Sequence, residues 1–313
     1  MRLFYATDVH GSERCFRKFL NAAEFYGADA VLLGGDITGK AIVPLVASNG
    51  RYEGAFLDAV VSAAPGEELG RLEQKIANTG YYAWRCTRDE RDSVEQDPAA
   101  QHDLFIRLIV ERVRAWAALA AERLGSKGIP CLINAGNDDP QEVDGALESG
   151  GWVTFLEGRV VELPDGTQVA SCGYANMTPW ACPRDVSEEE LGRRLEAAIS
   201  QLDDPSAAIF NFHCPPYDSG IDAGPKLRDD FRVTAGAGGI EMHPVGSTAC
   251  RLAIERYQPL LGLHGHLHES RGATKVGRTI CINPGSEYTE GILRGALIEL
   301  RKGKVKSHQF TTG

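Results

Sequence analysis

The segment Leu3-Phe4-Tyr5-Ala6-Thr7-Asp8-Val9-His10 joins a short apolar run to a carboxylate and an imidazole. A run of this length that ends in polar residues is typical of a buried strand. In an extended segment, residues two apart project from the same face, so Asp8 and His10 can bind one cation. The segment therefore predicts a strand that carries a candidate ligand pair at its C-terminal end.

Four further blocks of polar residues follow other short apolar runs in the same way. The runs are 30–33, 129–134, 207–212 and 259–263, and the blocks behind them are Gly35-Asp36, Gly136-Asn137-Asp138, His213 and Gly265-His266-Leu267-His268. Sites in open α/β sheets collect at the C-terminal ends of strands, so we expect these side chains to meet. Their carboxylate, amide and imidazole groups suit Mn, Fe or Zn better than Ca.

Each block also has an ordinary structural interpretation. Gly-Asp is often only a turn, Gly-Asn-Asp can cap a helix, and His213 can be a satisfied core histidine. The concentration of His264, His266 and His268 at one strand end is harder to explain without a metal. The histidine cluster is therefore the strongest of the metal-binding signals.

Composition describes a globular chain of 313 residues, 43% of them hydrophobic, with a formal net charge of -10. This charge argues against binding to long nucleic acid or an anionic membrane. The eight cysteines form no C-x-x-C pair, which favours reduced, buried thiols. No signal peptide or run of about 18 apolar residues is recognised, so we expect a cytoplasmic protein.

The remaining sequence predicts helices and a second group of strands. Ser12 and Ser187 are candidate helix N-caps, and Gln101 to Leu124 has one apolar stripe that indicates core packing. The interval 39–127 is too long for an ordinary connection, and we expect a helical cap or insertion there within a single domain, 1–313. Three strand pairs are expected after residue 150, so two packed sheets are favoured over one parallel sheet.

In their order and context, the five blocks resemble the calcineurin-like metallophosphoesterase superfamily, whose pattern is D-x-H, GD, GN-H/D/E, H and GH-x-H. The resemblance covers nearly the whole chain apart from the insertion. It implies an α/β fold, a four-layer αββα sandwich of two mixed β-sheets flanked by helices. It also implies two divalent or mixed-valence metal ions. Asp8, His10, Asp36 and His268 would hold the first metal with Asp36 bridging, and Asn137, His213 and His266 would complete the second.

The third block departs from the family pattern, because Asp138 stands where a histidine usually assists the leaving group. A carboxylate can donate a proton there only if it is protonated. His243 and His264 are the spare histidines that we consider as substitutes. Their alternative roles are a surface-loop residue for His243 and a support behind the ligands for His264.

The resemblance implies a metal-dependent phosphoesterase that hydrolyses a small phosphorylated substrate with a metal-bridging water. The sequence does not distinguish a phosphodiesterase from a phosphatase. The alternative is a noncatalytic binding or scaffold protein that keeps the fold. Because all seven expected metal ligands are present, the enzyme is favoured.

Overall fold

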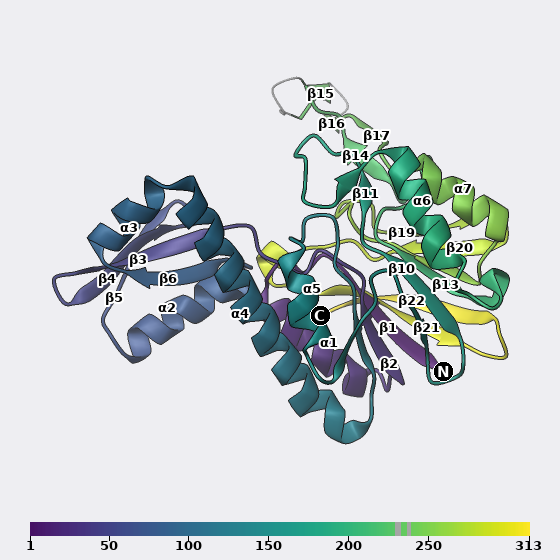
Figure 1. Cartoon of the computed structure of the whole chain (residues 1–313), viewed down its shortest axis with the longest axis horizontal. Coiled ribbons are helices and arrows are strands. Elements are labelled where there is room, and N and C mark those ends of the chain that lie inside the picture. Colours follow the sequence, from purple (N-terminus) through teal and green to yellow (C-terminus); the bar gives the residue numbers. More distant parts are fainter. Residues whose placement is uncertain (229–232, 237–238) are drawn as a thin grey trace.

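The computed structural model describes residues 1–228, 233–236 and 239–313, and its main body contains two six-stranded mixed sheets (Figure 1). The first sheet has the order β22 (Val305–Thr312), β21 (Arg294–Leu300), β1 (Arg2–Ala6), β2 (Ala30–Leu33), β7 (Cys131–Ile133) and β8 (Val153–Phe155). The second has the order β19 (Gly272–Val276), β20 (Thr279–Asn283), β18 (Leu261–Leu263), β13 (Ile209–Phe212), β10 (Gln168–Cys172) and β9 (Val160–Glu162).

Parallel pairing brings the five predicted strands into these two sheets. β1, β2 and β7 are neighbouring parallel strands in the first sheet, and β13 and β18 are neighbouring parallel strands in the second. The predicted strand pairs β9–β10, β19–β20 and β21–β22 are antiparallel, as expected for hairpins. The segment 152–162 is divided, however, because β8 joins the first sheet and β9 the second.

Three hydrophobic clusters bind the layers together. One lies between the sheets and includes Leu32, Ile209 and Leu263, all without solvent exposure. A second joins the outer face of the first sheet to α1 (Glu13–Phe25), α4 (Pro98–Leu124) and α5 (Glu142–Glu148). A third joins the second sheet to α6 (Glu188–Ile199) and α7 (Thr248–Tyr257). The four-layer αββα sandwich is therefore confirmed.

The expected helix signals are found at the expected residues. The Ser12 hydroxyl accepts a hydrogen bond from the Cys15 amide at the start of α1, and the Ser187 hydroxyl does the same for Glu190 at the start of α6. The apolar stripe of α4 packs into the core, where the Trp116 ring stacks on Phe16 with centroids 4.1 Å apart. This helix also links the insertion to the sandwich (Figure 1).

The insertion contains a sheet that the sequence analysis did not predict, so the description of it as helical was incomplete. Its helices are α2 (Glu67–Asn78), α3 (Arg88–Glu95) and α4, and its sheet has the order β5 (Ala59–Ala63), β4 (Arg51–Phe56), β3 (Ile42–Ser48) and β6 (Tyr82–Cys86). The overlooked signal is Asn49-Gly50 between β3 and β4, where both residues have positive φ, as the tight turn of a hairpin requires. These elements have a hydrophobic cluster of their own.

Small two-stranded ribbons complete the chain on the side of the second sheet. They pair β11 (Ala175–Asn176) with β12 (Asp185–Val186), β14 (Ala223–Pro225) with β17 (Met242–Pro244), and β15 (Ala235–Gly236) with β16 (Gly239–Ile240). Single 3-10 turns lie at Gly125–Lys127, Pro205–Ala207 and Tyr288–Glu290. Among the described residues, no helix combines the length and the apolar character that crossing a membrane requires.

Replacing Trp116 with alanine is expected to lower the free energy of unfolding by about 3–5 kcal/mol, because it removes a buried ring and leaves a cavity. Denaturant unfolding measures this change. The matched control is Trp180→Ala, which removes a ring that is 67% exposed and is expected to change stability by less than about 0.5 kcal/mol. Equal losses in the two variants would contradict the assignment of Trp116 to the core.

Candidate metal centre

The structure brings the seven predicted ligands together at one rim of the sandwich. They follow five strands: Asp8 and His10 follow β1, Asp36 follows β2, Asn137 follows β7, His213 follows β13, and His266 and His268 follow β18. Because parallel strands within each sheet end at the same edge, residues far apart in sequence become neighbours. The expected meeting of the five blocks is therefore observed.

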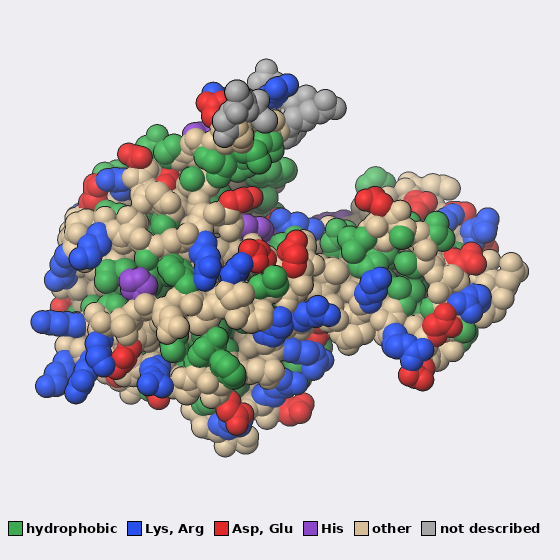
Figure 2. All heavy atoms as spheres, turned by 180° about the vertical axis from the view of Figure 1, so that it is seen from behind, with side chains coloured by type: hydrophobic (Ala, Val, Ile, Leu, Met, Phe, Trp, Pro, Cys, Tyr) green, Lys and Arg blue, Asp and Glu red, His purple; other side chains and the backbone are tan. Residues whose placement is uncertain are grey.

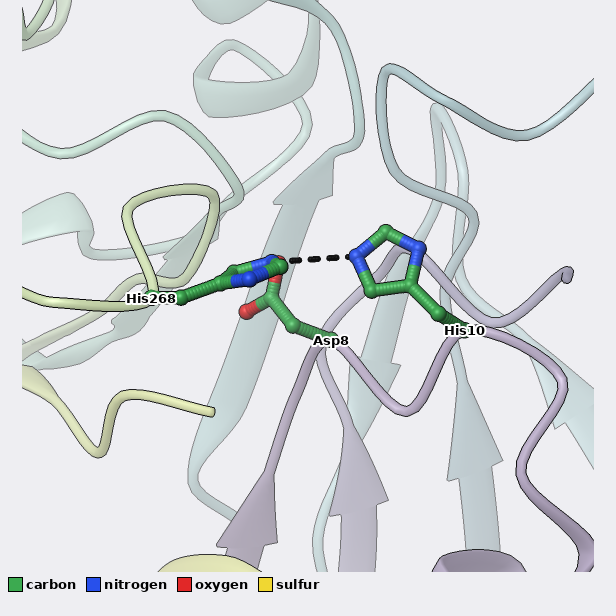
Figure 3. Close-up of side chains that lie close together, drawn as sticks. All are labelled: Asp8, His10 and His268. Atoms are coloured by element: carbon green, nitrogen blue, oxygen red, sulfur yellow. Dashed lines mark hydrogen bonds and ion pairs between the residues drawn. The ribbon is translucent and has the colours of Figure 1, made fainter. Parts of the chain in front are cut away.

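Asp8, His10 and His268 form one group of donors (Figure 3). The Nε2 atoms of the two histidines are 3.0 Å apart, and Nε2 of His268 is 3.6 Å from Oδ1 of Asp8. Figure 3 shows the two rings pointing toward one another above the carboxylate. Donor atoms about 2.1 Å from a shared metal lie roughly 3 Å apart, so this group has the spacing of a metal site.

Asp36, His213 and His266 form a second group beside the first. Nε2 of His213 lies 3.3 Å from Oδ1 of Asp36, and Nδ1 of His266 lies 2.8 Å from Oδ1 of Asn137. The other carboxylate oxygen of Asp36 is 3.7 Å from Nε2 of His10. Asp36 thus faces both groups, which is the position a bridging carboxylate needs.

The histidine tautomers fit a metal. Nδ1 of His213 is 3.3 Å from the carbonyl oxygen of Gly34, and a proton on Nδ1 leaves the Nε2 lone pair facing Asp36. Within the described residues that buried Nε2 atom has no hydrogen-bond partner. In the metal-free protein a second proton on Nε2 would face the Asp36 carboxylate, and a bound cation would take the place of that proton.

Charge and burial act in opposite directions on the histidines. Burial lowers the pKa of His10 to about 3 and that of His266 to about 4, so both rings are neutral at physiological pH. Burial alone would also lower the pKa of His213, but the Asp36 and Asp8 carboxylates outweigh it and raise that pKa to about 9. In the metal-free protein a proton on His213 therefore offsets part of the carboxylate charge.

The backbone is strained at the donors. Asp8, His10, Asp36 and His266 have φ values of 53°, 39°, 50° and 68°. Such left-handed conformations cost about 1–2 kcal/mol per residue and gather at functional sites. Two backbone hydrogen bonds, from Asp8 to Gly35 and from His10 to Asp36, help to hold the two loops in this arrangement.

The motif glycines leave room for the carboxylates. A Cβ atom on Gly136 would collide with the Asp36 side chain, and one on Gly265 would collide with Asp8. The glycines of the GN and GH blocks are therefore required by close packing.

Supporting residues that the sequence analysis missed fix the loops from behind. Both oxygens of the buried Asp139 carboxylate accept hydrogen bonds. The donors are the amides of Ile37, Thr38 and Gly136 and the Thr38 hydroxyl. Asp139 therefore holds the loops together and is not a candidate metal ligand. The Asn137 side-chain amide donates to Asp185 at 2.8 Å, which turns its oxygen toward His266. Nothing in the sequence around Asp185 suggests this role, because only folding brings it to Asn137.

The segment 283–286 also supports the site, as a turn beneath it. The Asn283 amide group donates to the carbonyl oxygens of Gly265 and Leu267, and the Ser286 hydroxyl donates to the carbonyl oxygen of Asp8. These bonds tie the GH-x-H loop to the loop that carries Asp8.

The three candidates for a catalytic acid lie in very different places. Asp138 is at the site, with Oδ2 3.7 Å from Nδ1 of His10 and 2.8 Å from Nζ of Lys40. His243 is exposed on β17, on the wall of a cavity that also includes His266. His264 is fully buried, and its Nδ1 is 2.8 Å from the carbonyl oxygen of Phe212.

The placement of His264 and the presence of Lys40 change the sequence-based interpretation. The Nε2 atom of His264 lies next to Gly262 on the face of the second sheet that carries Cys281, away from the donor groups. His264 therefore keeps only the supporting role. Lys40, at the start of the insertion, was missed, although it is the cation that pairs with the unusual Asp138.

Comparison by sequence gives a partial match and no family. No family model matches the chain. The uncharacterized protein MJ1162 of Methanocaldococcus jannaschii is 29% identical over 155 residues, which are 49% of this chain and 62% of that protein, so the chain spans less than two thirds of this curated relative.

Solved structures align over the whole chain. TT1561 of Thermus thermophilus has a TM-score of 0.53 and 17% identity, covering 100% of this chain and 97% of that one. Another solved structure has a TM-score of 0.55 and 14% identity, covering 100% and 98%. The chain therefore shares the overall fold of these two structures, and its αββα layers with five blocks on one rim are those that the resemblance to the calcineurin-like metallophosphoesterase superfamily implies.

Replacing Asp185 with alanine is expected to weaken metal binding by about tenfold to a hundredfold, because Asn137 loses the partner that orients its oxygen. Calorimetric titration of the metal-free protein with Mn²⁺ or Zn²⁺ measures this directly. The control, Asp203→Ala, removes an exposed carboxylate that accepts from the Gln168 side chain and should leave the affinity unchanged. An unaltered affinity in Asp185→Ala would show that Asn137 needs no such support.

Proposed function

We propose that this protein is a phosphoester hydrolase that holds two divalent metal ions and acts on a small phosphorylated molecule. The observation that carries the proposal is the pair of adjacent donor groups, Asp8 with His10 and His268, and Asp36 with His213 and His266, each with donor atoms within 4.8 Å of one another. The Asn137 oxygen adds a neutral ligand to the second group.

Two cations bound there would lower the pKa of a water molecule and neutralise the phosphoryl oxygens, which is the chemistry that in-line hydrolysis needs. The protein's own part is to hold the donors rigidly. Asp36 faces both groups, the backbone amide of His266 donates to both oxygens of Asp8, and that of Asp138 donates to Asp36. These bonds keep each carboxylate in one orientation, so no reorganisation is needed when a substrate binds.

Removal of the metals tests the core of the proposal. Exhaustive chelation, with metal loss verified by elemental analysis, is expected to abolish hydrolysis of p-nitrophenyl phosphate and of its bis-p-nitrophenyl diester. Added Mn²⁺, Fe²⁺ or Zn²⁺ should restore it. Activity that persists in the metal-free protein would contradict the proposal. Two bound metals without turnover on any phosphoester tested would favour the noncatalytic scaffold.

Lys40 and Asp138 are proposed to replace the histidine that the family usually has in the third block. The Lys40 side chain is half exposed at the site. Partial burial would lower the pKa of Lys40, but the Asp138 carboxylate outweighs this effect and raises that pKa, so Lys40 remains charged. A fixed positive charge at this point stabilises the negative charge that develops on a departing oxygen. His243, which is exposed on the β14–β17 ribbon, is the second candidate for this role.

Replacing Lys40 with methionine is expected to lower kcat by about tenfold to a hundredfold for alkyl phosphoesters, whose leaving groups are poor, and by less for p-nitrophenyl esters. Lys40→Arg should retain most of the activity because the charge is kept. The matched control is Lys306→Met. Lys306 lies on β22, is as exposed as Lys40 and pairs with Glu299 at 2.9 Å. Equal losses for good and poor leaving groups would contradict this role of Lys40.

A further inference from the structure

A cavity of about 680 Å³ opens beside the candidate metal centre, shares His266 with it and is also lined by the next residue, Leu267. Its other walls come from the loop after β11, which contributes Met177 and Trp180, and from the β14–β17 ribbon. The volume lies in the range of small-molecule sites, roughly 300–1,000 Å³. A group attached to a phosphate at the metal centre would thus find a space of suitable size next to it.

The walls of this cavity are unusually hydrophobic for a protein surface. Met177, Trp180 and Tyr217 are 58%, 67% and 40% exposed, although large apolar side chains are normally buried. In the described part of the chain, further exposed apolar residues, Ile240 and Met242, lie on the adjoining ribbons. The small ribbons project from the sandwich, and Figure 2 shows hydrophobic side chains gathered where this projecting part meets it. Such a concentration indicates a binding surface.

Two charged side chains on the cavity wall, Glu188 and Lys226, are already engaged. The Glu188 carboxylate accepts from the Thr248 and Ala249 amides at the start of α7. Lys226 pairs with Glu241 at 3.0 Å. Since Glu188 occupies the N-terminus of α7, that helix end does not provide a second phosphate site. The cavity therefore offers apolar contact, while the anion is held at the metal centre.

We infer that the cavity binds an aromatic group, aryl or heteroaryl, that is attached to the phosphate of the substrate. This rests on the proposed function. The indole of Trp180 and the phenol of Tyr217 line the walls, and the planar faces of aromatic rings favour a planar partner. Preference for such a group is then decided by this cavity, independently of the metals.

The test compares phosphonates, which carry the same anion and are not hydrolysed. Calorimetry with the metal-loaded protein is expected to show phenylphosphonate binding about tenfold more tightly than methylphosphonate, since a ring is buried. Cyclohexylphosphonate, of similar bulk but not planar, should bind less tightly than phenylphosphonate.

Trp180→Ala is expected to reduce the preference for phenyl over methyl to less than about threefold, and Trp180→Phe should keep part of it. The control is Leu252→Ala, which removes a side chain that is 65% exposed on α7 and outside the cavity; it should leave the preference unchanged. An unchanged preference in Trp180→Ala, or equal binding of the phenyl and cyclohexyl compounds, would overturn the inference.

The proposed function can be judged separately in the same experiments. If the protein hydrolyses small phosphoesters but phenylphosphonate has no advantage, only the assignment of the cavity fails. If no phosphonate binds and no phosphoester is hydrolysed, the proposed function fails and the cavity assignment falls with it.

Discussion

Two buried carboxylates, those of Asp8 and Asp36, impose the main constraint on this structure. They are 1% and 4% exposed and face the same small group of histidines. Burying two like charges together is strongly unfavourable unless positive charge or hydrogen-bond donors compensate them. A proton on His213 and the backbone amides of His266 and Asp138 supply part of that compensation. Bound cations would supply the rest, so the architecture of this rim is best understood as a scaffold built around positive charge.

The loops at the rim keep strained conformations because the structure behind them is firmly bonded. Asp139 joins the loop after β2 to the loop after β7 through its carboxylate, and Asn283 holds the loop after β18. The strands that end in these loops are buried in the cores between and outside the sheets. Strain at a few residues is thereby offset by many ordinary contacts elsewhere, which is the usual relation between a site and its scaffold.

The insertion contacts the site through the residues nearest the sandwich. Its own sheet lies apart from the sandwich (Figure 1), whereas Gly39, its first residue, packs against Gly11 in the loop that carries His10. The Ser12 hydroxyl donates to the carbonyl oxygen of Asn78, and Arg112 of α4 donates to that of Gly11. These contacts join the insertion to the loop that carries His10, and the amide of Gly39, next to Lys40, donates to the Tyr82 hydroxyl of β6. The insertion thus contributes to the rim although most of it lies elsewhere.

The sequence alone was sufficient for the five strands, the order of the polar blocks and the two-sheet architecture, because buried strands and their terminal residues leave a local pattern. It also predicted the stripe of α4. It did not predict the insertion's sheet, although the apolar run from Ile42 to Ala47 in β3 and the turn Asn49-Gly50 were local signs of it. Only the tertiary structure decided which polar side chains meet. It paired Lys40 with Asp138, placed Asp185 behind Asn137 and turned His264 away, because such contacts join residues whose separation in sequence carries no signal.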